Sequence, residues 1–555
     1  MTHPAFEKHR QTLEQALDAI QTRGYWTPYP ELPSPKFYGE DAAPQGKLDF
    51  ESHLGKNFEL DQPAQTGWHS SEESPFGIKL DISYPVCEPD TLVKAAKEAM
   101  PGWQRVGADA RAGICLEILE RLNKKSFEIG HAVMMTSGQA WMMAFQAGGP
   151  HAQDRALEAV TYAWREQRFV PTESVWEKPQ GKNQPIQMRK HFEIVGRGVG
   201  LVIGCGTFPT WNTYPGLFAA LATGNGVIVK PHSNSILPAA ITVKTIREVL
   251  TEYGVDPNLV SLCVAPSREM TQQLAVHPDI KSIDFTGGSA FGQWLLDNCK
   301  QANVYAELAG VNNIVIDSTD AYKAMLNNIA FTLSLYSGQM CTTTQLIIVP
   351  ENGIQTEDGH KTYEDVCSDL AKSVERFLSK PEVAHAVLGA IQSGATLERI
   401  EQANQSEFGQ VLLASQALTH PELPNAVVRT PVVVACDAKD ESVYMQEQFG
   451  PISFVVKAAD TAAAIDLSER VVSTHGALTV GLYSTDEQVI EAMTQATWRS
   501  KVALSINLTG SVLVNQSAAF SDYHGTGGNP AGNAAYADSA FVANRFRVIQ
   551  RRYHV

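Results

Sequence analysis

From Phe192 onward, short apolar segments alternate with helical segments, and this alternation constrains the fold more than any other feature of the chain. The first run contains VGLVIGC, GVIVKP, PAAITVKTIREVLTEYG, LVSLCVAP and KSIDFTGGS. Strands that alternate with helices of this length imply right-handed crossovers and a parallel sheet with helices on both faces. A second run extends from NVYAEL to ALTVGLYS. Two lobes are more economical than one sheet of a dozen strands, so we expect an α/β chain with two doubly wound lobes.

The segments that flank these runs have a different texture. Helical patterns dominate from Pro89 to about Arg168, whereas residues 26–76 are rich in proline, glycine and acidic residues and predict irregular structure. From about Ser511 the chain is rich in glycine, alanine and asparagine, in the segment HGTGGNPAGNAAYAD. We interpret this end of the chain as an arm rather than a third lobe.

Composition argues against several classes of function. The 555 residues are 44% hydrophobic and 19% charged, as in ordinary globular proteins. The formal net charge of -16 provides no general attraction to nucleic acid or anionic lipid, so we expect neither as a partner. No segment approaches the roughly 20 uninterrupted apolar residues of a membrane span, and the start lacks the apolar block of a secretory signal.

Cysteine and histidine usage favours a reducing compartment and no metal. The eight cysteines are scattered along the chain, which fits neither a disulfide framework nor a CxxC site. The 15 histidines show no spacing typical of metal ligands. We therefore predict a cytoplasmic chain that binds no metal and in which at most one cysteine takes part in chemistry.

Four short motifs contain the candidate catalytic and binding residues. Small residues that end one strand and open a helix, as in Phe285-Thr286-Gly287-Gly288-Ser289, let backbone N–H groups approach a phosphate. Glu307 ends the strand NVYAEL, Cys341 lies in the small, polar turn YSGQMCT, and Glu447 opens the element EQFGP. Taken singly, each has an ordinary structural interpretation, namely a turn, a solvated carboxylate, a buried cysteine and a helix end. The signatures of P-loop, zincin, serine hydrolase and GxGxxG sites do not occur.

Taken together and in this order, the motifs resemble those of the aldehyde dehydrogenase superfamily. FTGGSAFG is similar to its phosphate loop, ELAG to its general-base strand, GQMCT to its nucleophile turn and EQFGPI to its ExFGP element, and Cys341 follows Glu307 by 34 residues. The resemblance implies two α/β lobes and a bridging arm that forms a homodimer or homotetramer. It divides the chain into a helical N-terminal part with an extension, a first arm segment, a nucleotide-binding unit, a catalytic unit and a second arm segment. These expected units are 1–182, 183–198, 199–307, 308–510 and 511–555.

The resemblance also implies a mechanism. A thiolate at Cys341 attacks the aldehyde carbon, a nicotinamide takes a hydride, and a thioester remains on the enzyme. Glu307 then activates the water that hydrolyses the thioester to a carboxylic acid. The expected activity is therefore the NAD(P)-dependent oxidation of a small-molecule aldehyde.

Cofactor contacts follow from the same resemblance. Lys230 is similar to the lysine that holds the adenosine ribose, Glu447 to the acid that holds the nicotinamide ribose, and Phe449 lies beside the ring. The phosphate loop supplies Phe285, Gly287, Gly288 and Ser289, with Gly288 in place of the usual serine. Ser233 stands where relatives that prefer NAD often have a glutamate that would repel a 2′-phosphate. We expect NADP to be preferred over NAD, although Ser233 is also compatible with a simple helix cap.

The position of the oxyanion donor is open. Counted back from Lys230 without a gap, the family's asparagine falls on Thr207, 23 residues earlier, so the amide is replaced by a hydroxyl. Asn212, in PTWNTYP, is 18 residues before Lys230 and requires a gap. We favour the register with Thr207 and keep Asn212 as a substitute from the next turn. Loss of one such donor costs about 10²- to 10³-fold in rate.

Within the superfamily, the N-terminal extension, the CGTFPTW segment and the glycine-rich tail resemble the phenylacetic acid degradation proteins of the PaaN type. This branch implies a semialdehyde attached to coenzyme A as substrate. Trp211, Tyr214, Met340 and Thr342 are candidates for the substrate pocket, although such residues also serve as ordinary packing.

Two other functions are compatible with the same residues. One is a cofactor-independent cysteine thioesterase or hydrolase that uses Cys341 and Glu307, for which the sequence identifies no histidine partner. The other is a catalytically silent scaffold, because the expected asparagine is displaced. A coenzyme A-acylating enzyme is disfavoured because Glu307 is present.

Overall fold

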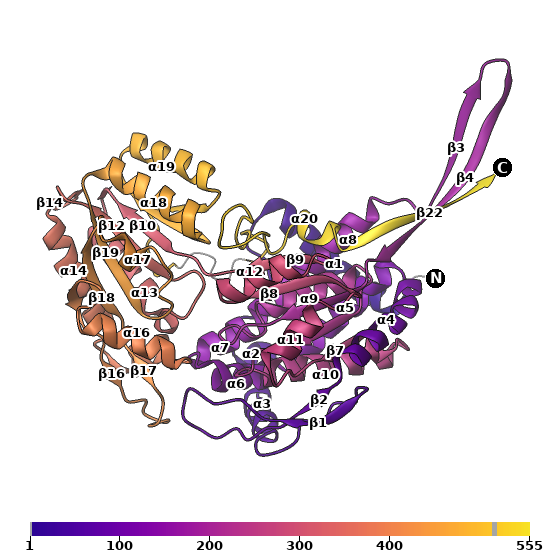
Figure 1. Ribbon diagram of the computed structural model, residues 1–555, viewed down its shortest axis with the longest axis horizontal. Coiled ribbons are helices and arrows are strands. Elements are labelled where there is room, and N and C mark those ends of the chain that lie inside the picture. The colour runs from indigo at the N-terminus through magenta and orange to yellow at the C-terminus, as the bar shows by residue number, and fades with distance from the viewer. Residues whose placement is uncertain (1–2, 513–518) are drawn as a thin grey trace.

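Two parallel sheets organise the chain (Figure 1). The computed structural model describes residues 3–512 and 519–555. The first sheet has the order β7-β6-β5-β8-β9, and all its neighbours are parallel. Its strands are β5 (Val199–Ile203), β6 (Val227–Lys230), β7 (Val260–Leu262), β8 (Ile280–Thr286) and β9 (Asn303–Glu307).

The second sheet has the order β15-β18-β19-β12-β10-β20-β21, and only the edge strand β15 runs antiparallel to its neighbour. Its strands are β10 (Asn312–Ile316), β12 (Thr344–Pro350), β15 (Gln410–Leu413), β18 (Val432–Asp437), β19 (Ile452–Ala458), β20 (Thr479–Tyr483) and β21 (Ala503–Ile506). The prediction of two doubly wound α/β lobes is therefore confirmed.

Helices cover both faces of the first sheet. They are α4 (Pro89–Val106), α5 (Ala108–Lys124), α6 (Ser126–Ser137), α7 (Trp141–Gly148), α8 (Pro150–Arg168), α9 (Thr213–Ala222), α10 (Leu237–Glu252), α11 (Arg268–Ala275) and α12 (Ser289–Asn298). Along β5, Val202 packs against the cluster built on α5, α8, α9 and α10, whereas Leu201 packs against α4, α11 and α12. Successive strand residues point to opposite faces, so a strand covered on both sides must be apolar throughout.

The second sheet is covered in the same way. Its helices are α13 (Tyr322–Ser334), α14 (Tyr363–Phe377), α15 (Pro381–Val387), α16 (Gly394–Asn404), α17 (Glu441–Tyr444), α18 (Thr461–His475) and α19 (Glu487–Ser500). Ile314 of β10 packs with α13 and α14, and its neighbour Val315 packs on the face that carries α16, α18 and α19. Two small sheets lie at the rim of this lobe, formed by β11 (Ser318–Thr319), β13 (Ile354–Thr356) and β14 (Gly359–Lys361), and by β16 (Ala417–Leu418) and β17 (Val428–Arg429).

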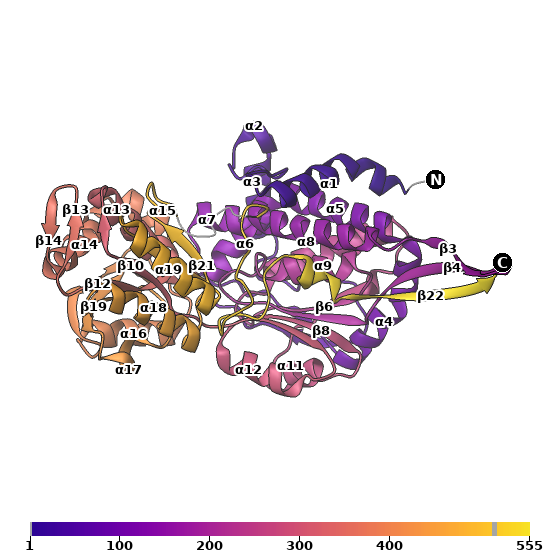
Figure 2. The same ribbon diagram turned by 90° about the horizontal axis from the view of Figure 1, so that it is seen from above.

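The N-terminal extension lies on the first lobe (Figure 2). It contains α1 (Pro4–Thr22), α2 (Pro35–Tyr38), α3 (Ala42–Glu51), β1 (Gln65–His69) and β2 (Tyr84–Cys87). A Cβ on Gly113 of α5 would come within 2.4 Å of the Phe6 nitrogen, so α1 packs directly against the backbone of α5. The buried carboxylate of Glu72 accepts hydrogen bonds from the N–H groups of Ile236 and Leu237 and so caps the start of α10.

A three-stranded antiparallel sheet projects from the first lobe (Figures 1 and 2). Its strands are β3 (Glu173–Gln180), β4 (Asn183–Gly196) and β22 (Phe546–His554), in the order β22-β4-β3. The expected arm segments 183–198 and 511–555 contain β4 and β22, while β3 lies within the expected unit 1–182. Within the second segment, residues 531–533 do not project but pair with the end of β9, and 513–518 are outside the described residues.

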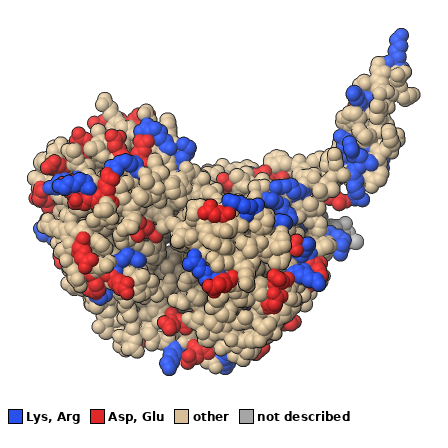
Figure 3. All heavy atoms as spheres, in the orientation of Figure 1, with Lys and Arg blue, Asp and Glu red and all other residues tan. Residues whose placement is uncertain are grey.

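Basic side chains gather along the projecting sheet (Figure 3). They are Lys178, Lys182, Arg189, Lys190, Arg547, Arg551 and Arg552. Across the described ranges 3–512 and 519–555, no helix combines the length and the apolar character needed to cross a bilayer.

A buried ion pair joins the base of β22 to the first sheet. Arg545 donates to both oxygens of Asp284 on β8, at 2.8 and 2.6 Å, and the two side chains are 1% and 4% exposed. The guanidinium also lies over the ring of Tyr305 on β9, 4.3 Å from its centroid. A charge pair in this position is stabilising only while both partners are present.

We expect Asp284→Ala to lower the free energy of unfolding by about 3–5 kcal/mol, because it leaves the buried Arg545 charge uncompensated. The matched control is Glu193→Ala, which removes the carboxylate of an exposed pair with Arg551 and is expected to cost less than about 1 kcal/mol. Urea unfolding monitored by circular dichroism compares the two variants. Equal losses would show that the buried pair does not anchor β22.

Candidate active site

Two cavities meet at Cys341. Figure 3 shows the surface hollowed between the two lobes. The larger cavity, of about 740 Å³, is lined at one edge by the carboxyl ends of β5, β6, β8 and β9 and at the other by Glu447 and Phe449 of the second lobe. The smaller one, of about 240 Å³, lies between α7, the loop before α9, α13 and the turn that carries Cys341. Cys341, Asn212 and Phe208 line both. The site thus joins a long cleft to an apolar pocket at one sulfur atom.

A tight turn places Cys341 between α13 and β12. Tyr336, Ser337 and Gly338 have φ values of 52°, 49° and 65°, so three consecutive residues adopt the left-handed conformation. A Cβ on Gly338 would lie 2.3 Å from the Gly450 oxygen, which excludes any larger residue there. The Ser337 hydroxyl donates to the Gly389 carbonyl at 3.0 Å and stabilises the turn.

The nucleophile turn is also tied to the strand next to it. The side-chain amide of Asn312, at the start of β10, donates to the Cys341 carbonyl at 2.8 Å. Its oxygen accepts from the N–H groups of Leu478 and Thr479. One asparagine therefore fixes the backbone of Cys341 relative to the middle of the second sheet.

Charge at the site is set by burial. The Cys341 sulfur, a Glu307 oxygen and a His524 nitrogen all lie within 4.8 Å of one another. Burial and the neighbouring Glu307 carboxylate raise the pKa of the Cys341 thiol well above its ordinary value. Burial also raises the pKa of Glu307, but the attraction and hydrogen bond of His524 outweigh it, and the net shift of that pKa is downward. The resting site therefore pairs a protonated thiol with an ionised carboxylate.

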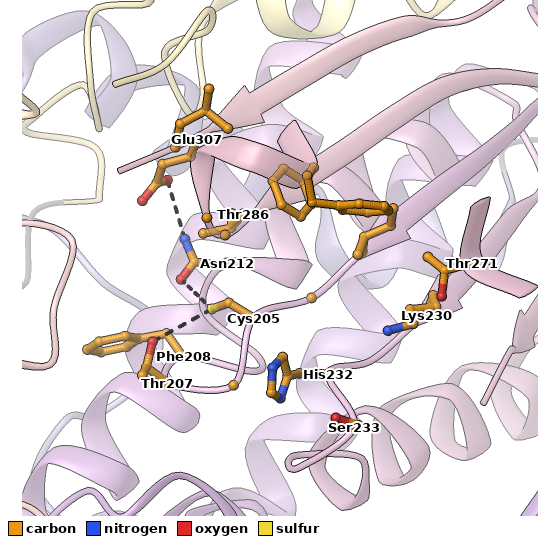
Figure 4. A pocket seen from close by; sticks show the side chains of 18 of the residues that line it. Cys205, Thr207, Phe208, Asn212, Lys230, His232, Ser233, Thr271, Thr286 and Glu307 are labelled. Atoms are coloured by element: carbon orange, nitrogen blue, oxygen red, sulfur yellow. Dashed lines mark hydrogen bonds between the residues drawn. The ribbon is translucent and has the colours of Figure 1, made fainter. Parts of the chain in front are cut away.

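A chain of hydrogen bonds orients the Glu307 carboxylate (Figure 4). The Cys205 thiol donates to Asn212 Oδ1 at 3.4 Å, and Asn212 Nδ2 donates to Glu307 Oε2 at 3.4 Å. His524 Nε2 lies 3.0 Å from the same oxygen. Burial raises the pKa of Cys205 to about 11, so this second thiol near the site is also protonated.

Thr207 and Asn212 occupy different places in the site. Asn212 lies at the start of α9 and borders both cavities beside Cys341. Thr207 borders only the larger one, and its hydroxyl is directed to the Cys205 sulfur at 3.9 Å. The gapless register from the sequence assigned the oxyanion role to Thr207. In the structure the Thr207 hydroxyl lies in the larger cavity alone, whereas the Asn212 amide lies where the two cavities meet.

The expected cofactor residues surround the larger cavity. Lys230, Ser233, Phe285, Gly287, Gly288, Glu447 and Phe449 all line it, while Ser289 is the first residue of α12 and is not part of the lining. Ser233 does not cap the helix that follows, since α10 begins after Ile236 without a side-chain cap of its own and is capped by Glu72. The alternative interpretation of Ser233 as a helix cap is therefore wrong.

The larger cavity fits a dinucleotide. Among the described residues, no atom lies within 4 Å of a Cβ built on Gly288 and no side chain caps the first N–H groups of α12, so a pyrophosphate could reach them. Burial raises the pKa of Glu447 to about 7, and from the described residues its carboxylate receives a single long hydrogen bond, from Gly310 at 3.4 Å. Ribose hydroxyls would supply the donors that this group lacks.

Charge at the Lys230 end of the cavity is positive. The acidic side chains in the lining are Glu307 and Glu447, both far along the cleft toward Cys341, whereas Lys230 and Arg268 line this end. Burial, reinforced by Lys230, lowers the pKa of His232 to about 4, so this histidine is neutral near pH 7 and adds no charge. Arg268 contributes a second positive charge beside Lys230, and the sequence analysis did not identify it.

The smaller cavity has an apolar lining. Met142, Met143, Phe208, Trp211, Phe331, Leu335, Met340, Ala386 and Val387 account for most of it. Trp211, Met340 and Thr342 were expected here and are present. The expectation for Tyr214 is wrong, because Tyr214 is fully buried in α9 and its hydroxyl shares a hydrogen bond of 2.8 Å with Thr242.

His524 is the site residue that the sequence analysis missed. It lies in the glycine-rich segment interpreted as an arm, and no pattern in the sequence distinguishes it from the other histidines. Cys341, Glu307 and His524 are also close enough for a soft cation, but His524 and Glu307 already satisfy each other by a hydrogen bond. The absence of a bound metal stays a prediction.

We expect alkylation of Cys341 by iodoacetamide to accelerate about tenfold per pH unit between pH 7 and 9, because its raised pKa keeps the thiolate scarce. Glu307→Gln removes the neighbouring negative charge, so it should shift this pH dependence to lower pH. Mass spectrometry of the Cys341 peptide measures the rate, and Glu375→Gln, an exposed position on α14, is the control. A plateau already reached at pH 7 in the unmodified protein would contradict the assignment of a resting thiol.

Comparison with known proteins identifies the family. Residues 87–534 match the model of the aldehyde dehydrogenase family. A crystal structure of an NAD-dependent aldehyde dehydrogenase from Burkholderia multivorans is 56% identical, covers 100% of both chains and superposes with a TM-score of 0.98.

More distant relatives share the fold. The 1-pyrroline-5-carboxylate dehydrogenase of Bacillus cereus (strain ATCC 10987 / NRS 248) is 23% identical over 417 residues, 72% of this chain and 74% of the relative. A Thermus 1-pyrroline-5-carboxylate dehydrogenase with bound NAD is 18% identical, covers 96% of this chain and 99% of its own, and has a TM-score of 0.73. This chain belongs to the aldehyde dehydrogenase family.

Proposed function

We propose that this protein oxidises an aldehyde to the carboxylic acid through a thioester on Cys341, with NAD as the electron acceptor. The observation that carries the proposal is the meeting of Cys341 and Glu307 at the junction of a dinucleotide-sized cleft and an apolar pocket. The cleft supplies one reactant, the pocket supplies the other, and the sulfur lies where they join.

The first half of the reaction forms a bond between sulfur and carbon. The Cys341 thiol transfers its proton to the Glu307 carboxylate while Sγ bonds to the aldehyde carbon, which leaves a negative charge on the aldehyde oxygen. We assign the stabilisation of this oxygen to Asn212, whose amide borders both cavities. Thr207 is the alternative donor from the sequence, and its place in the cleft alone makes it the weaker candidate.

A nicotinamide held by Glu447 and Phe449 would supply the hydride acceptor for the carbon attached to sulfur. Glu307 first releases the proton from Cys341 to solvent. In the second half of the reaction, Glu307 takes a proton from water and the water oxygen attacks the thioester carbon. The carbon–sulfur bond then breaks with its electron pair on Cys341, the acid is released, and the proton on Glu307 returns to the Cys341 thiolate. Burial beside apolar side chains excludes other water from the sulfur, which protects the thioester until Glu307 delivers the attacking molecule.

We assign the cofactor contacts as follows. Lys230 holds the adenosine ribose, the backbone of Gly287 and Gly288 with the start of α12 holds the pyrophosphate, and Glu447 and Phe449 hold the nicotinamide end. Phe285 closes the floor of this loop, since a Cβ on Gly287 would meet its ring at 2.8 Å. NAD is supported by the relative from Burkholderia multivorans, which is described as NAD-dependent.

We further propose that NADP is accepted. Ser233, Lys230 and Arg268 line the adenosine end of the cleft without a carboxylate, so a 2′-phosphate meets two positive charges and no repulsion. The preference for NADP that the sequence favours therefore stays a prediction, and the ratio of the two cofactors has to be measured.

The substrate pocket favours an uncharged, apolar aldehyde. Among the described residues, its lining contains no lysine or arginine that could bind a carboxylate at the far end of the substrate, and the His151 ring in the lining lies 2.8 Å from Glu31. A volume of about 240 Å³ is too small for a coenzyme A group, so a semialdehyde attached to coenzyme A would leave that group outside the pocket. The resemblance to phenylacetate degradation proteins of the PaaN type supports a semialdehyde attached to coenzyme A, whose apolar aldehyde end would enter the pocket while the charged coenzyme A group stays outside.

A cofactor-independent thioesterase is the second candidate function. His524 beside Glu307 and Cys341 supplies the histidine partner that the sequence did not identify. The large cleft beside these residues favours the dehydrogenase, because a hydrolase needs no such space.

The projecting sheet supports a homodimer or homotetramer. It exposes apolar side chains along β3 and β22, namely Val175, Val548, Ile549 and Tyr553, that a second copy would cover. A cytoplasmic location is supported by the eight cysteines, none of which forms a disulfide in the structure.

The proposal predicts a burst of one reduced cofactor per subunit when the enzyme meets an apolar aldehyde. Cys341→Ser abolishes the burst. Glu307→Gln retains it, because the lower pKa of the Cys341 thiol offsets the lost proton acceptor, but loses about 10²- to 10⁴-fold in turnover. Stopped-flow absorbance at the band of the reduced nicotinamide measures both quantities.

A panel that contrasts hexanal with succinate semialdehyde tests the pocket in the same assay. Hexanal is expected to have the higher kcat/KM, because succinate semialdehyde would bury an unpaired carboxylate. If no aldehyde reduces either cofactor while Cys341-dependent hydrolysis of a thioester proceeds without one, the thioesterase replaces the dehydrogenase.

Cofactor choice has its own variant. We expect Ser233→Glu to lower kcat/KM for NADP by about 10- to 100-fold through repulsion of the 2′-phosphate, with little effect on NAD. Ser233→Gln is the neutral control of equal size. Initial rates with each cofactor give the ratio, and an equal loss with NAD and NADP in both variants would place Ser233 away from the 2′ position.

A further inference from the structure

The glycine-rich segment after residue 518 is part of the active site. The N–H of Leu308 donates to the Ala531 carbonyl at 2.7 Å, and the N–H of Ala306 donates to Asn533 Oδ1 at 2.8 Å, so the segment runs along the end of β9. Asn529 ties the same segment to the second lobe through the Ala477 carbonyl at 2.9 Å. These contacts fix the segment on both sides of Glu307.

His524 is the side chain that this segment delivers. It is 2% exposed, and its Nε2 lies 3.0 Å from Oε2 of Glu307, which is 3% exposed. Its ring meets the edge of Trp211 at 4.6 Å between centroids, and it lines the smaller cavity. A packed ring with one nitrogen on the carboxylate has little freedom to turn.

The two carboxylate oxygens of Glu307 differ in their hydrogen bonding. Oε2 accepts from both His524 and Asn212. Oε1 is buried and has no hydrogen-bond partner among the described residues. A buried carboxylate oxygen without a donor costs free energy, so its retention points to a function. Oε1 is the oxygen left free to accept a proton.

We propose that His524 is a positioning residue for thioester hydrolysis: it holds Oε2 of Glu307 so that Oε1 faces the attacking water. This inference rests on the proposed dehydrogenase function. In the hydrolytic step Oε1 takes one proton from water and the hydroxide oxygen bonds to the thioester carbon. The carbon–sulfur bond then breaks with its electron pair on Sγ of Cys341, and Sγ takes the proton back from Oε1. His524 keeps its own proton throughout and acts through Glu307.

The contact between His524 and Glu307 also affects the pKa of Glu307. The titratable groups that face Glu307 are His524, Cys341 on the nucleophile turn, Arg155 on α8, Cys205 before α9 and Tyr536. Burial raises the pKa of Glu307, and His524 is the first cause that lowers it. Without this donor the charged form loses support, so the pKa of Glu307 rises and the base is protonated at higher pH.

The test compares His524→Leu with His524→Gln, whose amide N–H can still donate to Oε2. In His524→Leu we expect the burst of reduced cofactor to keep its amplitude, the hydrolytic turnover to fall at least tenfold, and the acid limb of its pH profile to move to higher pH. His524→Gln should recover most of the turnover and of the original acid limb. His360→Gln, exposed on β14 at the far side of the second lobe, is the matched control (Figure 1).

Two further measurements keep the outcome decisive. If His524→Leu fails to fold, His524→Ala with added imidazole replaces it, because the residue borders a cavity that imidazole can enter; rescue of hydrolysis by imidazole is expected. A pH profile in His524→Leu identical to that of the unmodified protein would overturn the inference. A missing burst in the unmodified protein would instead remove the proposed dehydrogenase function.

Discussion

The site depends on keeping a carboxylate ionised away from water and beside a thiol. Glu307 is almost fully buried, and burial alone favours its neutral form. Donors from two distant parts of the chain, Asn212 and His524, meet on one of its oxygens and offset that cost. Because both donors must contact the same oxygen, three segments must pack in a fixed relation to one another. They are the end of β9, the loop before α9 and the C-terminal segment. The geometry of the base is thus a property of the whole first lobe.

The Cys341 thiol, in contrast, is held in place by the second lobe. Three left-handed residues before Cys341 form a turn that few sequences tolerate, and Asn312 binds the carbonyl of Cys341 to the second sheet. The nucleophile is therefore rigid with respect to the second lobe and the base with respect to the first. Since the cleft runs between the lobes, its lining includes both the nucleophile and the base.

Local patterns predicted the fold and most of the site. Apolar runs punctuated by glycine and proline identify both sheets, because strands covered on two faces must be apolar throughout. Cys341, Glu307 and Glu447 were found because each lies in a short motif at a strand or helix end. His524 was not, since it meets Glu307 across 217 residues and carries no local signal. The prediction that Tyr214 lines the substrate pocket was wrong for the converse reason, because an aromatic residue next to a site motif can point into the core instead.

The glycine-rich tail shows why composition alone misjudged the C-terminal segment. A Cβ on Gly476 would lie 2.1 Å from the Ala531 nitrogen, and one on Gly527 would meet Ala534 at 2.8 Å. Glycine here permits close backbone packing of the tail against the body, whereas the same composition in isolation is typical of a mobile linker. The spacing from these contacts back to His524 is short, so any widening of the packing would withdraw the imidazole from Glu307. The close packing at these glycines therefore helps to hold His524 against Glu307. Substitutions of these glycines, which lie far from the Cys341 sulfur, should lower the rate of thioester hydrolysis before they lower the rate of thioester formation.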